Sequence, residues 1–396
     1  MEIFEILQER FFHLLTELFI TYKRYFFNHI DFNDKLIGIL GARGVGKTTF
    51  LLQYLKESII PLEKKLYVSA DSIELSDVSL FELANYFYKR GGELLIIDEI
   101  HKYPDFEKHL KQIYDVLNLK VIFSGSSALI LEHAKTDLSR RAVIYRVNGL
   151  SFREFLELKT GLSLKSYSLK EILLNHLDIS FEIVDKIKPF EHFYEYLKSG
   201  FYPFYFENPK TYLRKLEETI NIVIEADLPF LFKIDFKNII KLKKLVKLIC
   251  LSEPFKLNLT KLSERIGINR ATLYNYLHYL ELGNIFCIIH AKSKGDSIFS
   301  KPEKIYLDNS NLYYCYCEKQ NKGTIRETFV VSQLKNKYQL SYPKKGDLIV
   351  DGEYLMVIGG KNKDFSQIKD EGYLILDEIE IGRDRKIPLW LIGFVY

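Results

Sequence analysis

The pattern of apolar and polar positions changes period along the chain, and each change predicts a different element. In residues 1–34, apolar side chains recur every three or four positions, which predicts an N-terminal helix with one apolar face. These side chains are Phe4, Leu7, Phe11, Leu14, Leu18 and Tyr22. Residues 36–40 are instead continuously apolar, as in a buried parallel strand, and a helical period resumes with residues 49–55. The beginning of the chain therefore predicts a helix, a strand and a second helix.

The turn between this strand and the second helix is rich in glycine and fits the pattern G-x-x-x-x-G-K-[ST]. It consists of Gly41, Ala42, Arg43, Gly44, Val45, Gly46, Lys47, Thr48 and Thr49. Without Cβ atoms, the glycines let backbone N–H groups approach phosphate oxygens, and the helix adds its positive N-terminal end. Lys47 is expected to reach the β- and γ-phosphates of ATP, and the Thr48 hydroxyl to ligate Mg²⁺.

A second apolar run, residues 94–97, ends in two acids, Asp98 and Glu99. Ligands of open α/β sheets bind at the carboxyl ends of the strands, so both carboxylates are expected beside the glycine-rich turn. Asp98 is the expected anchor for Mg²⁺, through water or through Thr48. Glu99 is the expected catalytic residue that polarises the water attacking the γ-phosphate.

Two further segments carry candidate catalytic residues. The apolar run 121–123 is followed by a Ser/Gly turn, in which Ser126, or alternatively Ser124, can sense the γ-phosphate; an ordinary turn is the competing interpretation. Residues 142–147 are a further predicted strand, preceded by Arg140 and Arg141. In a homo-oligomer, Arg141 or Arg140 can stabilise the charge on the phosphates of a neighbouring subunit, although both also suit an ordinary surface.

The segment 151–235 is mostly helical in pattern and is interpreted as a lid; its "SFRE" start, Ser151 to Glu154, is a capping box. Residues 236–295 combine a lysine-rich amphipathic helix with helix-turn-helix spacing, in which Gly267 permits the tight turn and Asn269 caps the second helix. The polar residues expected on the outer face are Arg270, Thr272, Asn275 and His278. They suit contact with DNA, whereas packing beside an ATPase core is the alternative.

A nuclease is one hypothesis for the last hundred residues, 296–396, because the family resemblance described below implies an endonuclease-like domain there. A metal-dependent nuclease of the restriction-endonuclease type needs an acid, followed by a strand that carries acid-x-Lys. Glu327 and Asp347 are candidate acids, but Gly359 stands two positions before Lys361, where the central acid belongs. A degenerate structural or binding domain is therefore favoured over an active nuclease. The closing segment 386–396 is predicted to be a buried strand containing Trp390.

Several of these segments, in this order, resemble a family of prokaryotic, archaeal-type AAA ATPases. The segments are the glycine-rich turn, "YVSADS", "IIDEIHKYPDF", "SGSSA", "LSFREFL", "YLKSGFYPFYFE", "KIYLDNSNL" and "GTIRETFVVSQL". The resemblance implies an α/β fold: a P-loop core with a parallel αβα sandwich over residues 35–150, a helical lid, a winged helix-turn-helix and an endonuclease-like C-terminal domain. It also implies binding and hydrolysis of ATP with Mg²⁺.

Composition narrows the class of protein. With 47% hydrophobic and 27% charged residues the chain is expected to be globular, and it has no unbroken apolar run of the roughly 20 residues that a membrane span requires. Cys250, Cys287, Cys315 and Cys317 contain no CxxC pair, so we expect neither a zinc site nor a disulfide framework, and a cytoplasmic location. Many aromatic, Ile, Lys and Glu residues and only 2 Met are typical of a thermophile protein. The net charge of +4 selects no partner.

Overall fold

The computed structural model divides the chain into two compact units, Met1–Asn148 and Gly149–Tyr396. It describes residues 2–19, 22–76, 78–126, 138, 140–251, 258–291, 302–368 and 371–396. The finer division into five domains remains a prediction. No helix in these described ranges combines the length and the apolar character that a membrane crossing requires.

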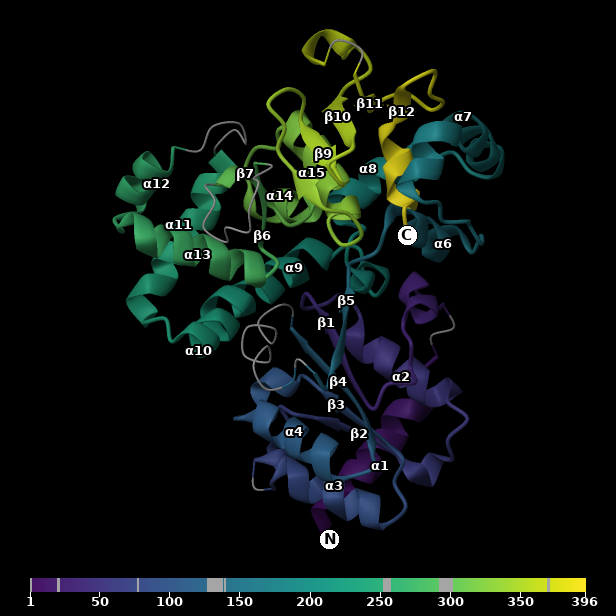
Figure 1. Cartoon of the computed structure of the whole chain (residues 1–396), viewed down its shortest axis with the longest axis vertical. Helices are drawn as coiled ribbons and strands as arrows, with labels where there is room; N and C mark the ends of the chain where they lie inside the picture. The colour runs from purple at the N-terminus through teal and green to yellow at the C-terminus, as the bar shows by residue number, and fades with distance from the viewer. Residues whose placement is uncertain are drawn as a thin grey trace. The chain divides into compact units, whose positions relative to one another are not determined.

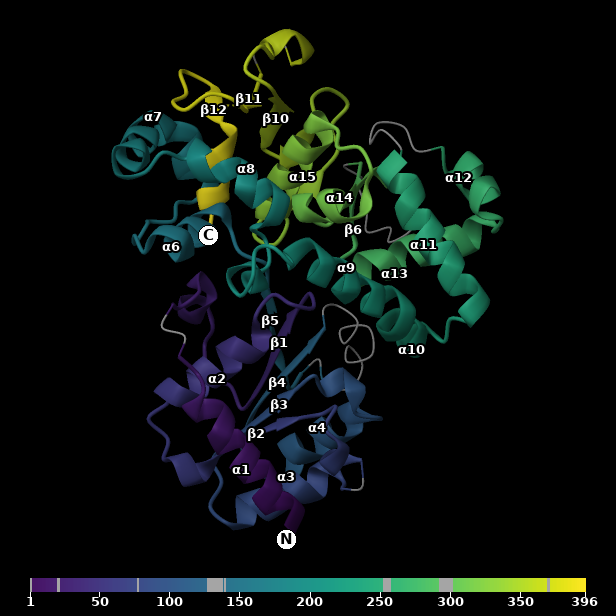
Figure 2. The ribbon, with the colours of Figure 1, turned by 180° about the vertical axis from the view of Figure 1, so that it is seen from behind.

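The first unit is built around one five-stranded sheet in which every strand pair is parallel, with the order β2-β3-β4-β1-β5. Its strands are β1 (Leu36–Gly41), β2 (Lys65–Ser69), β3 (Leu94–Asp98), β4 (Lys120–Ser126) and β5 (Val143–Val147). Its helices are α1 (Glu2–Thr16), α2 (Lys47–Glu57), α3 (Leu80–Lys89) and α4 (Phe106–Val116). Figures 1 and 2 show α3 and α4 on one side of this sheet and α2 on the other. The prediction of an α/β fold with a parallel sheet is confirmed.

The apolar runs of the sequence become the centre of this sheet. All residues of β1 and β3 are buried, as expected for parallel strands that are covered by helices on both faces. Leu83 and Phe87 of α3 and Leu110 of α4 belong to one hydrophobic cluster with side chains of β1, β2, β3 and β4. The sheet is therefore a rigid support for residues at the carboxyl ends of its strands.

The N-terminal helix is shorter than its apolar pattern predicts. Helix α1 ends at Thr16, although Leu18 is buried as well, and Tyr22 is not helical. Phe4 and Leu7 pack into the cluster formed with α3 and α4. After α1 the chain forms a 3₁₀ turn, Tyr25–His29, whose Phe26 and Phe27 rings contact Phe50 of α2. The later part of the apolar pattern therefore reflects burial outside a helix.

The second unit begins with a helical segment. Its helices are α6 (Phe152–Thr160), α7 (Leu169–Lys186), α8 (Phe190–Ser199), α9 (Tyr212–Ile222) and α10 (Leu228–Phe232), with a π-helical turn, Val223–Asp227, between the last two. The predicted capping box is present at the start of α6, where the side chains of Ser151 and Glu154 each bond the other's backbone N–H. The helical pattern of residues 151–235 is thus confirmed, whereas its function as a lid is a separate proposal.

Three helices and a hairpin of strands follow. They are α11 (Phe236–Leu251), α12 (Leu259–Ile266), α13 (Arg270–Leu282), β6 (Phe286–His290) and β7 (Pro302–Leu307), and β6 and β7 are antiparallel. Gly267, with φ 77°, ends α12, and the Asn269 side chain accepts the Thr272 N–H at the start of α13. The turn between α12 and α13 therefore forms as the sequence predicts. The segment between β6 and β7, residues 292–301, lies outside the described residues.

The cysteine prediction is wrong for one pair. Cys250 of α11 forms a disulfide with Cys317, 67 residues later, with a Cα–Cα distance of 5.2 Å. Sequence patterns such as CxxC detect only neighbouring cysteines, so a pair brought together by the fold escaped them.

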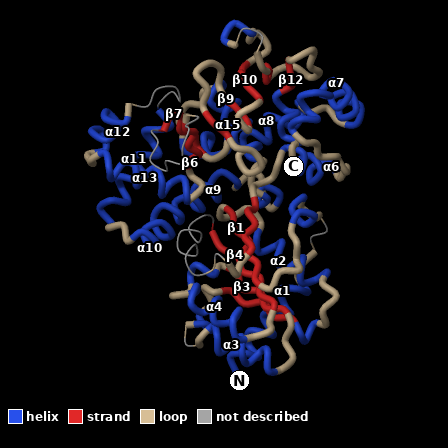
Figure 3. The backbone as a smooth tube through the Cα atoms, viewed as in Figure 1, coloured by secondary structure: helices blue, strands red, loops and turns tan. Residues whose placement is uncertain are grey.

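The unit closes with two helices and a second five-stranded sheet, drawn with strands in red in Figure 3. The elements are α14 (Ser310–Tyr316), α15 (Lys322–Leu334), β8 (Leu340–Ser341), β9 (Leu348–Val350), β10 (Tyr354–Gly359), β11 (Tyr373–Leu376) and β12 (Lys386–Pro388). The sheet order is β12-β11-β10-β9-β8. The predicted closing strand is mostly wrong: after β12 the chain forms a 3₁₀ helix, Leu389–Phe394. Trp390 and its neighbours in this helix are buried. A short, continuously apolar segment can be a buried strand or a buried helical turn, which is why the strand prediction failed.

Candidate functional site

The glycine-rich turn joins β1 to α2 at the carboxyl edge of the first sheet. Gly44, with φ 83°, and Gly46, with φ 90°, have left-handed conformations that residues with a Cβ rarely adopt. Gly46 is also the N-cap residue of α2, and glycine has no side chain to bond the first N–H groups of the helix. These N–H groups and the positive end of α2 suit an anion such as phosphate.

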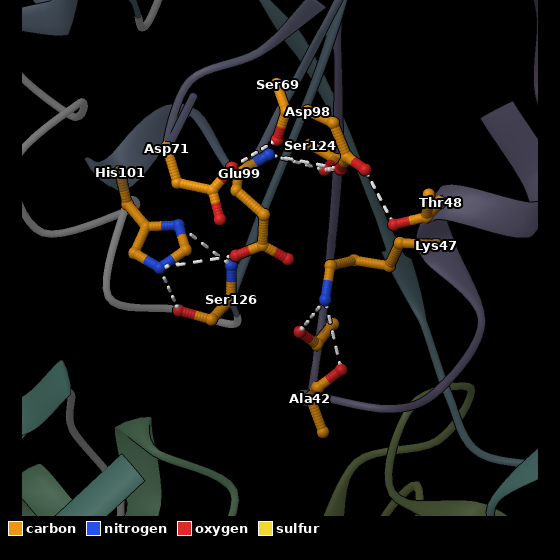
Figure 4. Close-up of polar contacts among 11 residues, drawn as sticks. Ala42, Lys47, Thr48, Ser69, Asp71, Asp98, Glu99, His101, Ser124 and Ser126 are labelled. Atoms are coloured by element: carbon orange, nitrogen blue, oxygen red, sulfur yellow. Dashed lines mark hydrogen bonds and ion pairs between the residues drawn. The ribbon is translucent and has the colours of Figure 1, made fainter. Parts of the chain in front are cut away.

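Lys47 is the first residue of α2, and its side chain points back into the turn (Figure 4). Its ammonium group donates hydrogen bonds to the carbonyl oxygens of Gly41 and Ala42, both at 3.1 Å. The residue is only 4% exposed. The positive charge therefore already lies inside the turn before any nucleotide binds.

Asp98 ends β3 and connects the turn to three strands. Its Oδ2 accepts hydrogen bonds from the hydroxyls of Thr48, at 2.6 Å, and Tyr67, at 2.8 Å. Its Oδ1 accepts from the Ser124 hydroxyl and from the Glu99 N–H, the latter at 3.1 Å. These four hydrogen bonds hold Asp98 in one orientation.

Tyr67 of β2 was not a candidate from the sequence. Burial raises the pKa of its phenol, and the adjacent Asp98 carboxylate raises that pKa further, so the phenol stays protonated and donates to Asp98. The available signal was the hydroxyl group of Tyr67 within "KLYVS", a strand whose first four residues are buried. Such a group needs a hydrogen-bond partner in the core.

The two candidate serines of β4 have different partners. Ser124 binds Asp98 and also accepts the Glu99 N–H at 3.2 Å. Ser126 pairs with Gly41 of β1 in the sheet register, so it lies next to the first residue of the turn. Ser126 contacts His101, and His101 contacts Glu99, as Figure 4 shows. The structure therefore brings Ser126 and Glu99 to the same edge as Lys47 and Thr48.

Arg24 is a second residue that the sequence did not reveal. It is 7% exposed, and its Nη1 donates to the carbonyl oxygens of Val45, at 2.9 Å, and Asn148, at 2.8 Å. Val45 lies within the glycine-rich turn, and Asn148 is the last residue of the first unit. One guanidinium group thus connects the turn to the end of this unit.

Arg141 lies away from the turn. Its Nε and Nη2 donate to the two carboxylate oxygens of Asp115, at 2.8 and 2.9 Å. Arg141 precedes β5 and Asp115 lies near the end of α4, so both belong to the amino edge of the parallel sheet. Within one copy the structure does not bring Arg141 to Lys47. Its role as an arginine finger, and that of the exposed Arg140, remain predictions that require a second subunit.

The residues at the carboxyl edge fit a magnesium ion and a triphosphate. The Thr48 hydroxyl and the Asp98 carboxylate are hard oxygen ligands of the kind that Mg²⁺ prefers, and they lie 2.6 Å apart. Lys47 and the N–H groups of the turn offer positive charge to phosphate oxygens. Residues 41–49, with Asp98, would therefore hold Mg²⁺ and ATP.

The candidate nuclease residues of the second unit are arranged differently. Glu327 and Asp347 are both buried, and the Lys304 ammonium lies 2.9 Å from Glu327 Oε2 and 3.7 Å from Asp347 Oδ1. Lys361 is exposed. In the described part of the chain, no group of three or more His, Cys, Asp or Glu residues is arranged to hold a metal ion. The two acids do not fit a metal as they stand, because they already share a cation supplied by the protein.

The chain is similar to known families in two regions. A family model for an AAA domain matches residues 33–156, and a model for a domain of unknown function matches residues 190–321. The uncharacterized protein MJ1637 of Methanocaldococcus jannaschii is 28% identical over 391 residues, which cover 88% of this chain and 82% of the relative.

Two solved structures are similar at low scores. AMPPCP-bound DnaA from Aquifex aeolicus has a TM-score of 0.27 and 14% identity, covering 69% of this chain and 88% of DnaA. PCH-2 of C. elegans has a TM-score of 0.24 and 18% identity, covering 40% of this chain and 44% of PCH-2. The match over residues 33–156, together with the parallel sheet and its glycine-rich turn, supports an ATP-binding AAA-type ATPase core.

Proposed function

We propose that the chain is a Mg²⁺-dependent ATPase whose nucleotide state controls the position of residues 151–295. In this proposal residues 151–235 are a lid and residues 236–295 a winged helix-turn-helix. The observation that carries the ATPase is the convergence at one sheet edge: Lys47 lies in the turn, Thr48 bonds Asp98, and Glu99 follows directly.

Each of these residues has a distinct task. Lys47 binds phosphate oxygens, and Thr48 with Asp98 holds Mg²⁺, which supplies positive charge to the phosphates when bound. Glu99 orients the attacking water and accepts its proton. Ser126, next to the turn, donates to the γ-phosphate and so distinguishes ATP from ADP.

Arg24 supports the coupling between nucleotide and the second unit. Its guanidinium bonds Val45 in the turn and Asn148, from which the chain continues directly into Gly149. A shift of the turn on nucleotide binding changes the hydrogen bond between Arg24 Nη1 and the Val45 carbonyl. Because Nη1 also bonds the Asn148 carbonyl, the change reaches Asn148. Arg24 therefore couples the glycine-rich turn to Asn148, the residue before the segment that leads into the proposed lid.

The direct test is calorimetric titration of the full chain with ATP and Mg²⁺, followed by measurement of phosphate release. We expect the parent to bind and hydrolyse ATP, and Lys47→Ala to weaken ATP binding by about 10–100-fold, because a charge-assisted hydrogen bond contributes about 1.5–3 kcal/mol. Lys64→Ala removes an exposed lysine that pairs with Glu93 outside the turn, and as the control it should leave ATP binding unchanged. If the folded parent shows no heat with ATP or GTP, the proposed function is wrong.

A nucleotide-gated DNA-binding protein is the second candidate. Helices α12 and α13 are joined at Gly267 and capped by Asn258 and Asn269, and Arg270 and Asn275 at their surface are exposed. Such a helix pair suits insertion of α13 into the major groove. The segment 292–301, where a wing would lie, is outside the described residues.

DNA binding is tested by fluorescence anisotropy with a labelled duplex, with ATP and with ADP, over a series of salt concentrations. We expect the affinity for DNA to depend on ATP and to fall steeply with salt. A plot of the logarithm of the binding constant against the logarithm of the salt concentration should have a slope of about −0.9 per phosphate contact. Arg270→Ala should reduce that slope by about one contact. Arg214→Ala, at an exposed position of α9, is the matched control. Affinity that is independent of salt and nucleotide excludes this candidate.

A further inference from the structure

His101 is a buried histidine near the carboxyl ends of β3 and β4, and it was not among the candidate residues from the sequence. It lies in a 3₁₀ turn, Ile100–Lys102, directly after β3, and it is 3% exposed. Its imidazole ring contacts Ser126 at the end of β4 and Glu99 at the end of β3 (Figure 4). Burial of a polar ring is unfavourable unless its nitrogens are bonded, and here both nitrogens contact proposed functional residues.

The backbone at Glu99 positions this ring. Glu99 has φ 51° and ψ 38°, a left-handed conformation that costs a residue with a side chain about 1–3 kcal/mol. Hydrogen bonds from its N–H to Asp98 Oδ1, at 3.1 Å, and Ser124 Oγ, at 3.2 Å, hold the conformation in place. Because the chain turns sharply there, the side chain two residues later reaches back to β4.

The hydrogen bonds of the ring define its tautomer. The Ser126 N–H donates to His101 Nδ1 at 3.4 Å, so in the neutral ring Nδ1 is the acceptor and the proton is on Nε2. Nε2 lies 3.2 Å from Ser126 Oγ and 3.5 Å from Glu99 Oε2. The Nε2–H group therefore faces two oxygens, one from each proposed functional residue.

We propose that His101 is a positioning residue that fixes the Glu99 carboxylate and connects it to Ser126. This inference rests on the proposed ATPase function. His101 transfers no proton: its Nε2–H donates to Glu99, and its Nδ1 is held by the backbone of Ser126. Contact of Ser126 with a γ-phosphate then shifts the imidazole, and the imidazole aligns the carboxylate that orients the water.

The distances from His101 Nε2 to Ser126 Oγ and Glu99 Oε2 suit hydrogen bonds that shorten when ATP binds. Distances of 3.2–3.5 Å are at the long end for hydrogen bonds. Catalytic hydrogen bonds are often long without substrate and shorten in the complex. The link between Ser126 and Glu99 is therefore expected to become firm only when ATP is present, so that ADP leaves the carboxylate less well oriented.

Two substitutions separate this role from a purely structural one. His101→Phe keeps a planar aromatic ring but removes both nitrogens, whereas His101→Gln places an amide N–H near the position of Nε2. We expect His101→Phe to reduce kcat by about 10²-fold with little change in the Kd for ATP, because small misplacements of a catalytic group have effects of that size. His101→Gln should recover most of the loss.

A double variant isolates the connection to Glu99. If His101 acts through Glu99, His101→Phe should produce no further loss of kcat in a Glu99→Gln background, whereas independent effects would multiply. His109→Phe, the same substitution on α4 beside Tyr103, is the matched control and should keep the parent rate. Thermal unfolding of each variant verifies that it is folded.

The outcomes are distinguishable. A parent that does not hydrolyse ATP overturns the proposed function, and this inference with it. If the parent is active, three results overturn the role of His101 alone. They are an unchanged kcat in His101→Phe, equal losses of kcat in His101→Phe and His101→Gln, and losses that multiply when His101→Phe is combined with Glu99→Gln. Loss in the phenylalanine variant, recovery in the glutamine variant and no added loss in the double variant support it.

Discussion

Glu99→Gln is expected to lower kcat for ATP hydrolysis by about 10²–10⁴-fold, the usual contribution of general acid–base catalysis, while ATP still binds. The glutamine side chain has nearly the same shape, so it fits the same space, but it cannot accept a proton. Asp98 retains the hydroxyls of Thr48 and Tyr67, and the bond from the residue 99 N–H is a backbone bond that survives the substitution. Binding and turnover should therefore separate in this variant.

The measurement is single-turnover release of labelled phosphate, together with the Kd for ATP from calorimetry. Glu93→Gln is the control. Glu93 lies at the amino end of β3, whereas Glu99 follows its carboxyl end, and Glu93 forms an exposed ion pair with Lys64. It should leave both quantities unchanged. Phosphate release by Glu99→Gln at the parent rate would eliminate the role assigned to this carboxylate.

The features predicted correctly from the sequence depend on neighbouring residues. The strand, glycine-rich turn and helix of residues 36–57 form a contiguous pattern, and the Asn269 cap of α13 bonds Thr272, three residues away. Backbone conformation and capping operate at this range, so a single sequence contains the necessary information.

The features that were missed depend on pairs that are distant in the chain. Tyr67 and Asp98 are 31 residues apart, His101 and Ser126 are 25 apart, and Arg24 and Val45 are 21 apart. The first two pairs become neighbours through the order of β2, β3 and β4, and the third becomes neighbours because the segment before β1 lies against the turn after it; the local pattern specifies neither arrangement. The same reasoning explains the unexpected disulfide between Cys250 and Cys317.

A buried ionic cluster in the second unit supports a prediction about stability. Lys304 of β7 donates to Glu327 of α15, and the two side chains are 1% and 5% exposed. Glu327 also accepts a hydrogen bond from the Tyr306 hydroxyl, while Asp347 Oδ2 accepts the Ile358 N–H at 2.8 Å. Burial raises the pKa of the Glu327 carboxyl, and the Lys304 ammonium counteracts that increase. The lysine therefore makes the burial of two carboxylates tolerable.

Lys304→Met is expected to lower the free energy of unfolding by about 3–5 kcal/mol, because removal of one partner leaves a buried charge without compensation. Equilibrium unfolding in urea, followed by circular dichroism, measures the change. Lys64→Met is the control, since Lys64 and Glu93 are both exposed and their pair is screened by water. The double variant Lys304→Met/Glu327→Gln should recover part of the loss, because a neutral pair carries no charge to desolvate.

The pH dependence of this loss gives an independent test. A carboxyl group whose pKa is higher in the folded than in the unfolded state destabilises the fold increasingly as pH rises through the two values. Without Lys304, the pKa of Glu327 should rise further, so the deficit of Lys304→Met should be smaller near pH 5 than near pH 8. A deficit that is equal at both pH values, with no recovery in the double variant, would mean that Lys304 stabilises the unit through the packing of its aliphatic chain. In that case the two acids would be buried without needing its charge, and the cation shared by Glu327 and Asp347 would have no part in stability.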